Sequence, residues 1–492
     1  MKHIDLDPLG ERLPIKIDST SNGEFVPQII SETSAAGNRL AERQVGINAK
    51  RVGLPRRKFL ISAMGAATTL LAHNETHAQA KQTGGFFDIP DIAALEADAA
   101  IETLGKKEFI FDVQGHFVNP TGKWLEQIPP GIRPLAGMPK SQCEFSDDPG
   151  DRSYLECLSG DQFIKDIFLD SDTDLMVLSF VPSKADAEPL TIEEAAAVRD
   201  IVDKMDGHRL FLHGRVNPNQ PGDLELMDDL AANWEIAAWK CYTQYGPEGR
   251  GFWLDDEPGI ALIEKARALG IKNICVHKGL SFGPQSFEHS RCDDIGRVAK
   301  RFPDVNFLVY HAGYDVIQVE ESFRESAGKN GIDSLVQSLL DNDVSPNSNV
   351  YAELGSTWRF LMQKPVEAAH ALGKLFKYVG QDNVLWGTDS IWYGSPQDQI
   401  LAFRSFQISD ELQEKYGYQK MNDGLRAKVF GLNALKPYNL NLEQVYKSVK
   451  EDRLNQARLE YSEQPNPAFQ THGPKNRREF LNLLTWNGGR AT

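Results

Sequence analysis

Five residues with metal-binding or acid–base chemistry follow short apolar segments that lie far apart in this chain. Gln114 and His116 follow the first of these segments. His277 and His311 end two later ones, and Asp389 follows the last. Imidazole nitrogens and carboxylate oxygens bind Zn²⁺ and similar divalent ions, and the same groups transfer protons. One such histidine alone is usually structural, but this set predicts a shared metal-dependent or acid–base catalytic site.

The apolar segments have the length and composition of strands. They are short and nearly continuous, as expected for parallel strands buried on both faces, and they span 108–114, 173–180, 210–216, 235–242, 273–277, 305–311, 349–354 and 383–388. Amphipathic stretches separate them, including 192–204, 259–269, 292–301 and 366–379. This alternation predicts right-handed βαβ units. The predicted fold class is α/β, a (β/α)8 TIM barrel, whose active site lies where the strands end.

The alternation of side chains along the first strand predicts which residues face the barrel interior. Asp112, Gln114 and His116 fall on one face because side chains alternate with a period of two. If that face is the interior, Gln114 and His116 point towards the same place as the later histidines and Asp389.

Several motifs occur in a consistent order over residues 108–440. They are Phe111-Asp-Val-Gln-Gly-His116, Val276-His277, Tyr310-His-Ala-Gly313, Trp386-Gly-Thr-Asp-Ser390 and Gly431-Leu-Asn-Ala434. In this order and spacing the chain resembles the amidohydrolase superfamily, in particular the branch that includes aminocarboxymuconate-semialdehyde decarboxylase and related hydrolases.

The resemblance implies a role for each residue of the site. His116, His277 and Asp389 match metal ligands, and Gln114 stands where a fourth would be. His311 matches the histidine that acts on the water or the substrate. The implied chemistry is attack by a metal-activated water, with Asp389 transferring the proton. The implied ion is divalent, zinc first, with manganese and iron as alternatives.

Two residues set this chain apart within the resemblance. The superfamily usually has His-x-His on the first strand, and here Gln114 replaces the first histidine. An amide oxygen is a weaker ligand that suits hard ions or a water-bridged role, so the metal's identity and the number of ions stay open. Lys240 lies near the end of the fourth strand, where some superfamily members carboxylate a lysine to bridge two metals. The alternative for Lys240 is a salt-bridged pocket lysine.

Further residues near the predicted mouth suit a substrate. Arg359 could pair with a carboxylate and Trp392 could pack on a flat group. The long connection between the first two strands is rich in Pro and Gly, which favours a lid or binding loop. Cys143 and Cys157 lie in or beside it, and a disulfide between them is an open alternative.

Residues 1–80 look like a targeting region. Residues 1–54 are polar and lack periodicity, which predicts disorder. Arg56 and Arg57 then precede a mildly apolar stretch that ends in Ala78-Gln79-Ala80. A basic region, a short apolar region and a small-x-small site resemble a twin-arginine export signal cleaved after Ala80. The prediction is a bacterial periplasmic protein whose partner is the twin-arginine export machinery. A basic linker followed by a small-residue helix is the alternative.

Composition excludes other classes of function. The net charge of −16 argues against nucleic-acid binding, which needs surfaces rich in Lys and Arg. No apolar run reaches the length of a membrane span. The five cysteines form no CxxC pair, so a zinc knuckle is not predicted.

The sequence thus predicts three parts and one main function. The parts are an N-terminal region with signal (1–80), a single barrel domain (105–440) with a long insertion after its first strand and a helical extension after its last strand, and a C-terminal tail (441–492). The predicted function is a metal-dependent hydrolase of a small amide, ester or lactone. A non-oxidative decarboxylase of a small acid, aromatic acids included, and a non-catalytic periplasmic binding protein on a decayed barrel are the alternatives. The oligomeric state stays open, and a homo-oligomer is compatible with the sequence.

Overall fold

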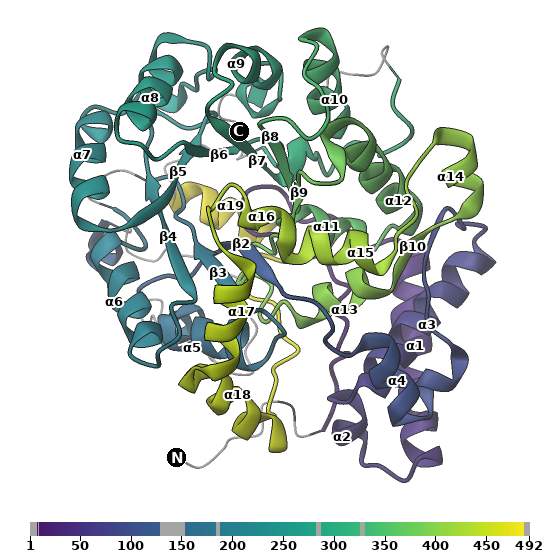
Figure 1. Ribbon diagram of the computed structural model, residues 1–492. Coiled ribbons are helices and arrows are strands. Elements are labelled where there is room, and N and C mark those ends of the chain that lie inside the picture. The colour runs from purple at the N-terminus through teal and green to yellow at the C-terminus, as the bar shows by residue number, and fades with distance from the viewer. Residues whose placement is uncertain are drawn as a thin grey trace.

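The computed structural model describes residue 7 and residues 9–127, 153–183, 187–281, 287–324 and 330–486. Eight strands form one parallel sheet in chain order: β2 (Phe111–Gly115), β3 (Leu175–Leu178), β4 (Leu210–Arg215), β5 (Ile236–Tyr242), β6 (Asn273–His277), β7 (Asn306–Tyr310), β8 (Val350–Glu353) and β9 (Val384–Leu385). A parallel bridge between Gly115 and Ser390 brings the chain after β9 back beside β2, so the barrel is nearly closed. The predicted (β/α)8 TIM barrel is confirmed (Figure 1).

Helices follow the barrel strands and cover the outside of the sheet (Figure 1). They are α6 (Ile192–Asp203), α7 (Asp223–Asn233), α8 (Glu257–Ala268), α9 (Ile295–Arg301), α10 (Ile332–Asp341), α11 (Thr357–Leu361), α12 (Pro365–Lys374) and α13 (Gln397–Ser405). Local sequence fixes several helix starts. At α6, for example, Thr191 and Glu194 cap each other's backbone N–H groups in a capping box. The predicted long insertion separates β2 from β3, and its described part includes α5 (Gly160–Ile164).

The barrel interior holds an apolar cluster to which the strands contribute. Its members are Phe109, Phe111, Val113, Leu175, Val177, Ala238, Cys275, Leu308, Tyr310, Tyr351, Leu385, Ala434, Tyr438 and Val449. Phe111 and Val113 are in this cluster, whereas Asp112 accepts hydrogen bonds from the backbone of Gln114 and Thr388. The register of β2 against β3 shifts between Asp112 and Gly115. A simple period of two therefore fails there, and Asp112 does not share the site with Gln114 and His116.

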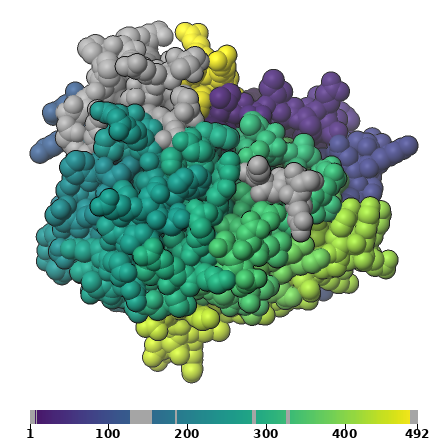
Figure 2. Space-filling model, turned by 90° about the horizontal axis from the view of Figure 1, so that it is seen from above, coloured from purple at the N-terminus to yellow at the C-terminus, as the bar shows by residue number. Residues whose placement is uncertain are grey.

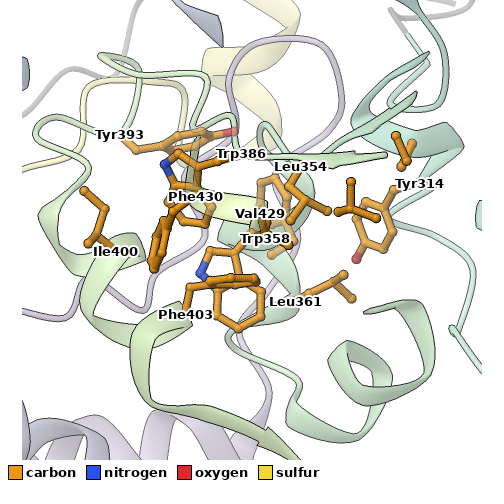
Figure 3. Close-up of a cluster of buried hydrophobic side chains, with 14 of the residues drawn as sticks. Tyr314, Leu354, Trp358, Leu361, Trp386, Tyr393, Ile400, Phe403, Val429 and Phe430 are labelled. Atoms are coloured by element: carbon orange, nitrogen blue, oxygen red, sulfur yellow. The ribbon is translucent and has the colours of Figure 1, made fainter. Parts of the chain in front are cut away.

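A second cluster of buried apolar side chains packs beside β8 and β9 (Figure 3). Trp358 of α11 packs edge-on against Phe403 of α13, with ring centroids 5.1 Å apart. Trp386, which follows β9, lies 4.9 Å from Phe430 and 5.2 Å from Phe403. Trp386 belongs to the segment that leads from β9 to Asp389, so this cluster packs against the chain just before the site.

The N-terminal region is folded where the structure describes it. It forms α1 (Glu32–Arg51), α2 (Arg56–Leu60), α3 (Ala63–Gln79) and α4 (Ala97–Leu104), and β1 (Gly85–Phe87) pairs antiparallel with β10 (Phe406–Ile408). Helices α1 and α3 approach closely at Gly37, where a Cβ atom would lie 2.4 Å from the His73 ring. The expectation of disorder in residues 1–54 is wrong for the described residues, because tertiary packing orders a polar segment that has little periodicity of its own.

The two arginines of the predicted export signal have partners within the chain. Arg56 donates to the carbonyl oxygens of Gly10 and Glu42, at 2.7 and 3.1 Å. Arg57 donates to the carbonyl oxygen of Pro467 at 2.7 Å. These contacts give the arginines a structural role, and export stays a prediction.

The predicted helical extension after the last strand forms α14 (Asp410–Tyr416), α15 (Asp423–Ala427) and α16 (Asn433–Leu435). The C-terminal tail is also helical in its described part, with α17 (Leu442–Glu451), α18 (Arg453–Glu463) and α19 (Arg477–Trp486). A buried bidentate ion pair between Arg209 and Asp452 fixes the start of α18. The chain then returns to residues near the N-terminus. Thr20 Oγ1 donates a hydrogen bond to Thr471 Oγ1, and the backbone N–H of Ser21 donates to the carbonyl oxygen of Pro474. Residues from the two ends of the chain consequently lie side by side (Figure 2). Among the described residues no helix is long and apolar enough to span a membrane.

Candidate active site

His277 and His311 face each other at the ends of β6 and β7. Both side chains are fully buried, and their ring centroids lie 4.6 Å apart. His277 Nε2 lies 3.1 Å from the carbonyl oxygen of Leu280, and His311 Nδ1 lies 2.6 Å from that of Gly355. A carbonyl oxygen only accepts, so these nitrogens carry the protons. The lone pairs are then on His277 Nδ1 and His311 Nε2, which have no hydrogen-bond partner among the described residues.

Burial favours the neutral form of both rings. Desolvation lowers the pKa of His277 well below its usual value and that of His311 to about 4, because a charged imidazolium loses its hydration there. A neutral imidazole with a fixed tautomer is the form that binds a metal ion.

A carboxylate from the N-terminal segment completes this group. Glu24 Oε1 lies 3.3 Å from His277 Nδ1, and Glu24 Oε2 lies 3.7 Å from His311 Nε2. The three side chains are buried and offer ligand atoms that all lie within 4.8 Å of one another. One carboxylate oxygen and two unpartnered imidazole nitrogens form a donor set suited to Zn²⁺ or a similar divalent ion. The residues present therefore fit a metal ion.

Asp389 collects the other predicted ligands. His116 Nε2 and Gln114 Nε2 lie 3.1 and 3.0 Å from its Oδ1. Asn22 and Ser356 donate to its Oδ2, at 2.7 and 2.5 Å. Burial alone would raise the pKa of Asp389, but the hydrogen bonds and the charge of His116 outweigh it and lower that pKa below its ordinary value. Asp389 is therefore an ionised carboxylate held by four donors.

The predicted metal ligands thus separate into two connected groups. His277 lies with His311 and Glu24, whereas His116 and Gln114 bind Asp389. Asn22 joins the groups, since its Nδ2 also lies 2.5 Å from Glu24 Oε2. Hydrogen bonding alone does not give His277 and His311 the different roles that the resemblance implied, because both turn an unprotonated nitrogen towards the same carboxylate.

Backbone conformation at the site is unusual. His311, Ser356 and Asp389 all have positive φ angles, in the left-handed region that residues with a Cβ rarely adopt. Such conformations persist only where surrounding contacts enforce them, and they concentrate at functional sites. Here Glu353 supplies part of that support, because its carboxylate accepts from the backbone N–H groups of His311 and Gly355. Burial raises the pKa of Glu353 to about 8.

Lys240 lies on β5 inside the barrel and has no ion pair or hydrogen bond among the described residues. Its Nζ lies 3.7 Å from the centroid of the Tyr310 ring and 4.8 Å from that of Tyr242. Desolvation lowers the pKa of Lys240, although nearby acidic groups oppose this shift. The expectation of a salt-bridged lysine is wrong, because the electron-rich faces of two tyrosines take the place of a carboxylate partner.

The two predicted substrate contacts have partners of their own. Arg359 is fully buried and donates to Asp18 Oδ1 at 2.9 Å, while its Nε and Nη1 have no partner among the described residues. Trp392 stacks on His116, with ring centroids 5.9 Å apart and planes at 29°. Trp392 thus lies beside His116, which contacts Asp389, and Arg359 binds Asp18 from the N-terminal part of the chain. Substrate contact stays a prediction for both. The open alternative of a disulfide involves Cys143, which lies outside the described residues.

The comparisons with known proteins agree with the motifs. A sequence model described as Amidohydrolase matches residues 243–440, which include His277, His311 and Asp389. The predicted resemblance to the amidohydrolases is confirmed. None of the curated proteins matches the chain.

Solved structures that are similar to this chain have low sequence identity to it. A 5-carboxyvanillate decarboxylase from Novosphingobium aromaticivorans, complexed with manganese and 4-hydroxy-3-methoxy-5-nitrobenzoic acid, is 15% identical over 68% of this chain and 96% of its own, with a TM-score of 0.45. A 2,6-dihydroxybenzoate decarboxylase from Rhizobium is 13% identical over 68% of this chain and 99% of its own, with a TM-score of 0.40. An uncharacterized TIM-barrel protein from Bordetella bronchiseptica is 13% identical over 70% and 100%, with a TM-score of 0.41. At these identities and TM-scores the likenesses say nothing of this chain's substrate.

Glu24, Asn22 and Ser356 were not predicted as site residues. Glu24 and Asn22 come from a polar segment far upstream of β2, and no strand end marks them. The short sequence Asn22-Gly23 indicates a turn, but a turn signal carries no information about where the turn docks. Ser356 follows β8 and could have been found as a polar residue beyond a strand end.

Proposed function

We propose that this protein is a metal-dependent hydrolase of the amidohydrolase type that acts on a small amide, ester or lactone. The observation that supports this most is the pair of unpartnered nitrogens, His277 Nδ1 and His311 Nε2, which face one carboxylate inside the barrel. An ionised Asp389 lies in the same hydrogen-bonded network. A divalent ion bound there would polarise a carbonyl group and lower the pKa of a coordinated water.

The side chains of the proposed enzyme have separable tasks. His277 and His311 would hold the ion through their unprotonated nitrogens, and the carbonyl oxygens of Leu280 and Gly355 keep those tautomers in place. Asp389 would accept the proton that an attacking water loses. His116 beside it stabilises the negative charge and orients the carboxylate. The surrounding buried rings, among them Trp392, exclude bulk water from the reacting groups.

Non-oxidative decarboxylation is the second candidate, and Lys240 is the observation that favours it. A buried ammonium group without an anionic partner among the described residues is suited to a substrate carboxylate. The faces of Tyr242 and Tyr310 beside it would suit a flat acid. In this reaction the bond from the carboxyl carbon breaks, carbon dioxide leaves, and the vacated carbon takes a proton.

Metal analysis followed by product analysis tests these proposals. Purified protein should contain stoichiometric zinc, manganese or iron, and His277→Ala should lose it together with activity. The exposed His208→Ala variant is the matched control and should keep both. Active substrates are then assayed in ¹⁸O-labelled water, where a hydrolase incorporates the label into product and a decarboxylase releases carbon dioxide. A wild-type protein that binds no divalent ion would refute both enzymatic candidates and favour the binding protein.

A further inference from the structure

The N-terminal segment, residues 14–25, is built into the active site rather than laid over it. Residues 14–17 and 20–25 of this segment are buried. Phe25 packs edge-on against Phe360, with ring centroids 4.8 Å apart. Asp18 pairs with the buried Arg359. The segment thus has its own packed and hydrogen-bonded position beside the barrel strands.

We propose that Glu24 is a metal ligand that the N-terminal segment supplies to the histidine pair of the barrel. This inference rests on the proposed metal-dependent function and adds a residue from outside the barrel to its centre. It makes residues 14–25 a required part of the catalytic domain.

The hydrogen-bonding pattern favours a cation among these three groups. The protons of His277 and His311 are already directed to carbonyl oxygens, so the nitrogens that face Glu24 carry lone pairs. An ionised carboxylate also offers only lone pairs. Three acceptors that face one another in a buried space repel unless a cation lies between them. A single proton could bridge one of the two contacts, whereas a divalent ion satisfies all three groups together.

The distances agree with shared coordination. Two ligands of a tetrahedral ion with bonds of about 2.0–2.1 Å lie about 3.3 Å apart. Glu24 Oε1 lies 3.3 Å from His277 Nδ1, and Glu24 Oε2 lies 3.7 Å from His311 Nε2. A small movement of the Glu24 carboxylate would therefore bring both of its oxygen-to-nitrogen distances to the separation expected of two ligands on one ion.

Neighbouring residues hold the Glu24 carboxylate in place. Gly23 has a positive φ, which lets the chain turn sharply just before Glu24. Asn22 donates to Glu24 Oε2 and to Asp389 Oδ2, so one amide group positions both carboxylates. Ser21 Oγ donates to the carbonyl oxygen of Phe25 at 2.7 Å and closes the loop across Glu24. Ligands held by such outer contacts are typical of built metal sites.

Metal affinity of Glu24→Gln tests the proposal without relying on activity. The variant is nearly isosteric, and Glu11→Gln is the control because Glu11 is an exposed carboxylate just before the same segment. Apo-proteins are titrated with Zn²⁺ or Mn²⁺ against a competing chelator, and bound metal is measured by elemental analysis. Loss of a residue that hydrogen-bonds to a metal ligand weakens metal binding by about 10–100-fold, so loss of a ligand itself should weaken it by at least about 100-fold. Glu11→Gln should match the wild type.

A second variant keeps the test decisive if Glu24→Gln folds poorly. Glu24→Cys loaded with Co²⁺ should gain a thiolate-to-cobalt charge-transfer band in the near ultraviolet, and neither wild type nor Glu11→Cys should show it. Wild-type affinity in Glu24→Gln together with no band in Glu24→Cys would refute the ligand role while leaving metal dependence intact. Activity of Glu24→Gln above the wild-type level would then identify the segment as an inhibitory plug. If the wild type itself binds no ion, both this inference and the proposed function are wrong.

Discussion

Replacement of Lys16 by methionine should release the N-terminal segment while the barrel stays folded. Lys16 is buried, and its Nζ donates to the carbonyl oxygens of Tyr393 and Ser395, each at 2.6 Å. The same Nζ lies 3.4 Å from Asp398 Oδ1, and the Lys16 backbone N–H donates to Asp398 Oδ2. Methionine keeps much of the apolar stem but removes the charge and the donors.

The size of the effect follows from what the change leaves behind. Asp398 is only 2% exposed and would become a buried carboxylate without its cation. Removing one partner of a buried pair costs about 3–5 kcal/mol. A cavity of about 420 Å³ lined by Lys16 and Asp398 allows water to approach the remaining charge, which favours the lower end of that range. Since each 1.36 kcal/mol is a factor of ten, local opening should increase by about 10²-fold.

Hydrogen exchange read by mass spectrometry measures this opening directly. Peptides that cover residues 14–25 should exchange about 10²-fold faster in Lys16→Met, while peptides from the barrel strands stay at the wild-type rate. Lys58→Met, at an exposed lysine of the same N-terminal region, should leave both rates unchanged. Lys16→Met combined with Asp398→Asn should recover part of the protection, because no unpaired charge remains. Unchanged exchange in residues 14–25 of Lys16→Met, or equal acceleration throughout the barrel, would refute the local anchoring role.

Three further predictions concern the site and the stability of the fold. His277→Ala and His311→Ala should lose bound metal to the same extent in elemental analysis, since both wild-type histidines turn an unprotonated nitrogen towards Glu24. If only His311→Ala kept its metal, the resemblance would be right that His277 binds the ion while His311 acts on the water or the substrate. Trp358→Ala should lower the free energy of unfolding by about 3–5 kcal/mol in urea titrations, because it removes a fully buried ring from the aromatic cluster, and a loss below about 1 kcal/mol would contradict that packing. The nearby Arg404 lowers the pKa of Asp172 even though burial of the carboxyl group opposes this shift. The ion pair therefore stabilises the protein above about pH 4, and this contribution is lost as pH falls through the lowered pKa of Asp172. The urea midpoint of Arg404→Met should fall less on acidification than that of the wild type, and parallel dependence of the two midpoints on pH would contradict this prediction.

The barrel was predictable because its signals are local. Each strand is a short apolar run, and the helices between carry amphipathic patterns that burial requires. The eight predicted strands correspond to β2–β9 with boundary differences of a few residues. The shift in register between Asp112 and Gly115 was not predictable, since a bulge depends on how two strands pair rather than on either strand alone.

The site was only partly predictable for the same reason. His277 and His311 end strands, so the topology of the barrel brings them together. The pairing of His116 and Gln114 with Asp389 also follows from the closure of the barrel between Gly115 and Ser390. Glu24 has no such local signal, because its position depends on long-range contacts of a segment without periodicity. The polar composition that predicted disorder is the composition that supplies its many hydrogen bonds to the barrel and the C-terminal chain.

The export prediction and the role proposed for Glu24 conflict, because export would remove residues 1–80 whereas the metal site needs Glu24 to stay with the barrel. The small residues of α3 resemble the apolar part of a signal, yet Ala66, Ala67 and Leu70 are buried in the structure, where small side chains allow close helix packing. Arg56 and Arg57 likewise suit a receptor and also bind the carbonyl oxygens of Gly10 and Pro467. Cleavage after Ala80 would sever Glu24 from the barrel, and with it the third ligand of the proposed ion. An active, metal-loaded enzyme that begins after Ala80 and lacks the N-terminal fragment would therefore refute the ligand role of Glu24, whereas loss of metal on that cleavage would support it.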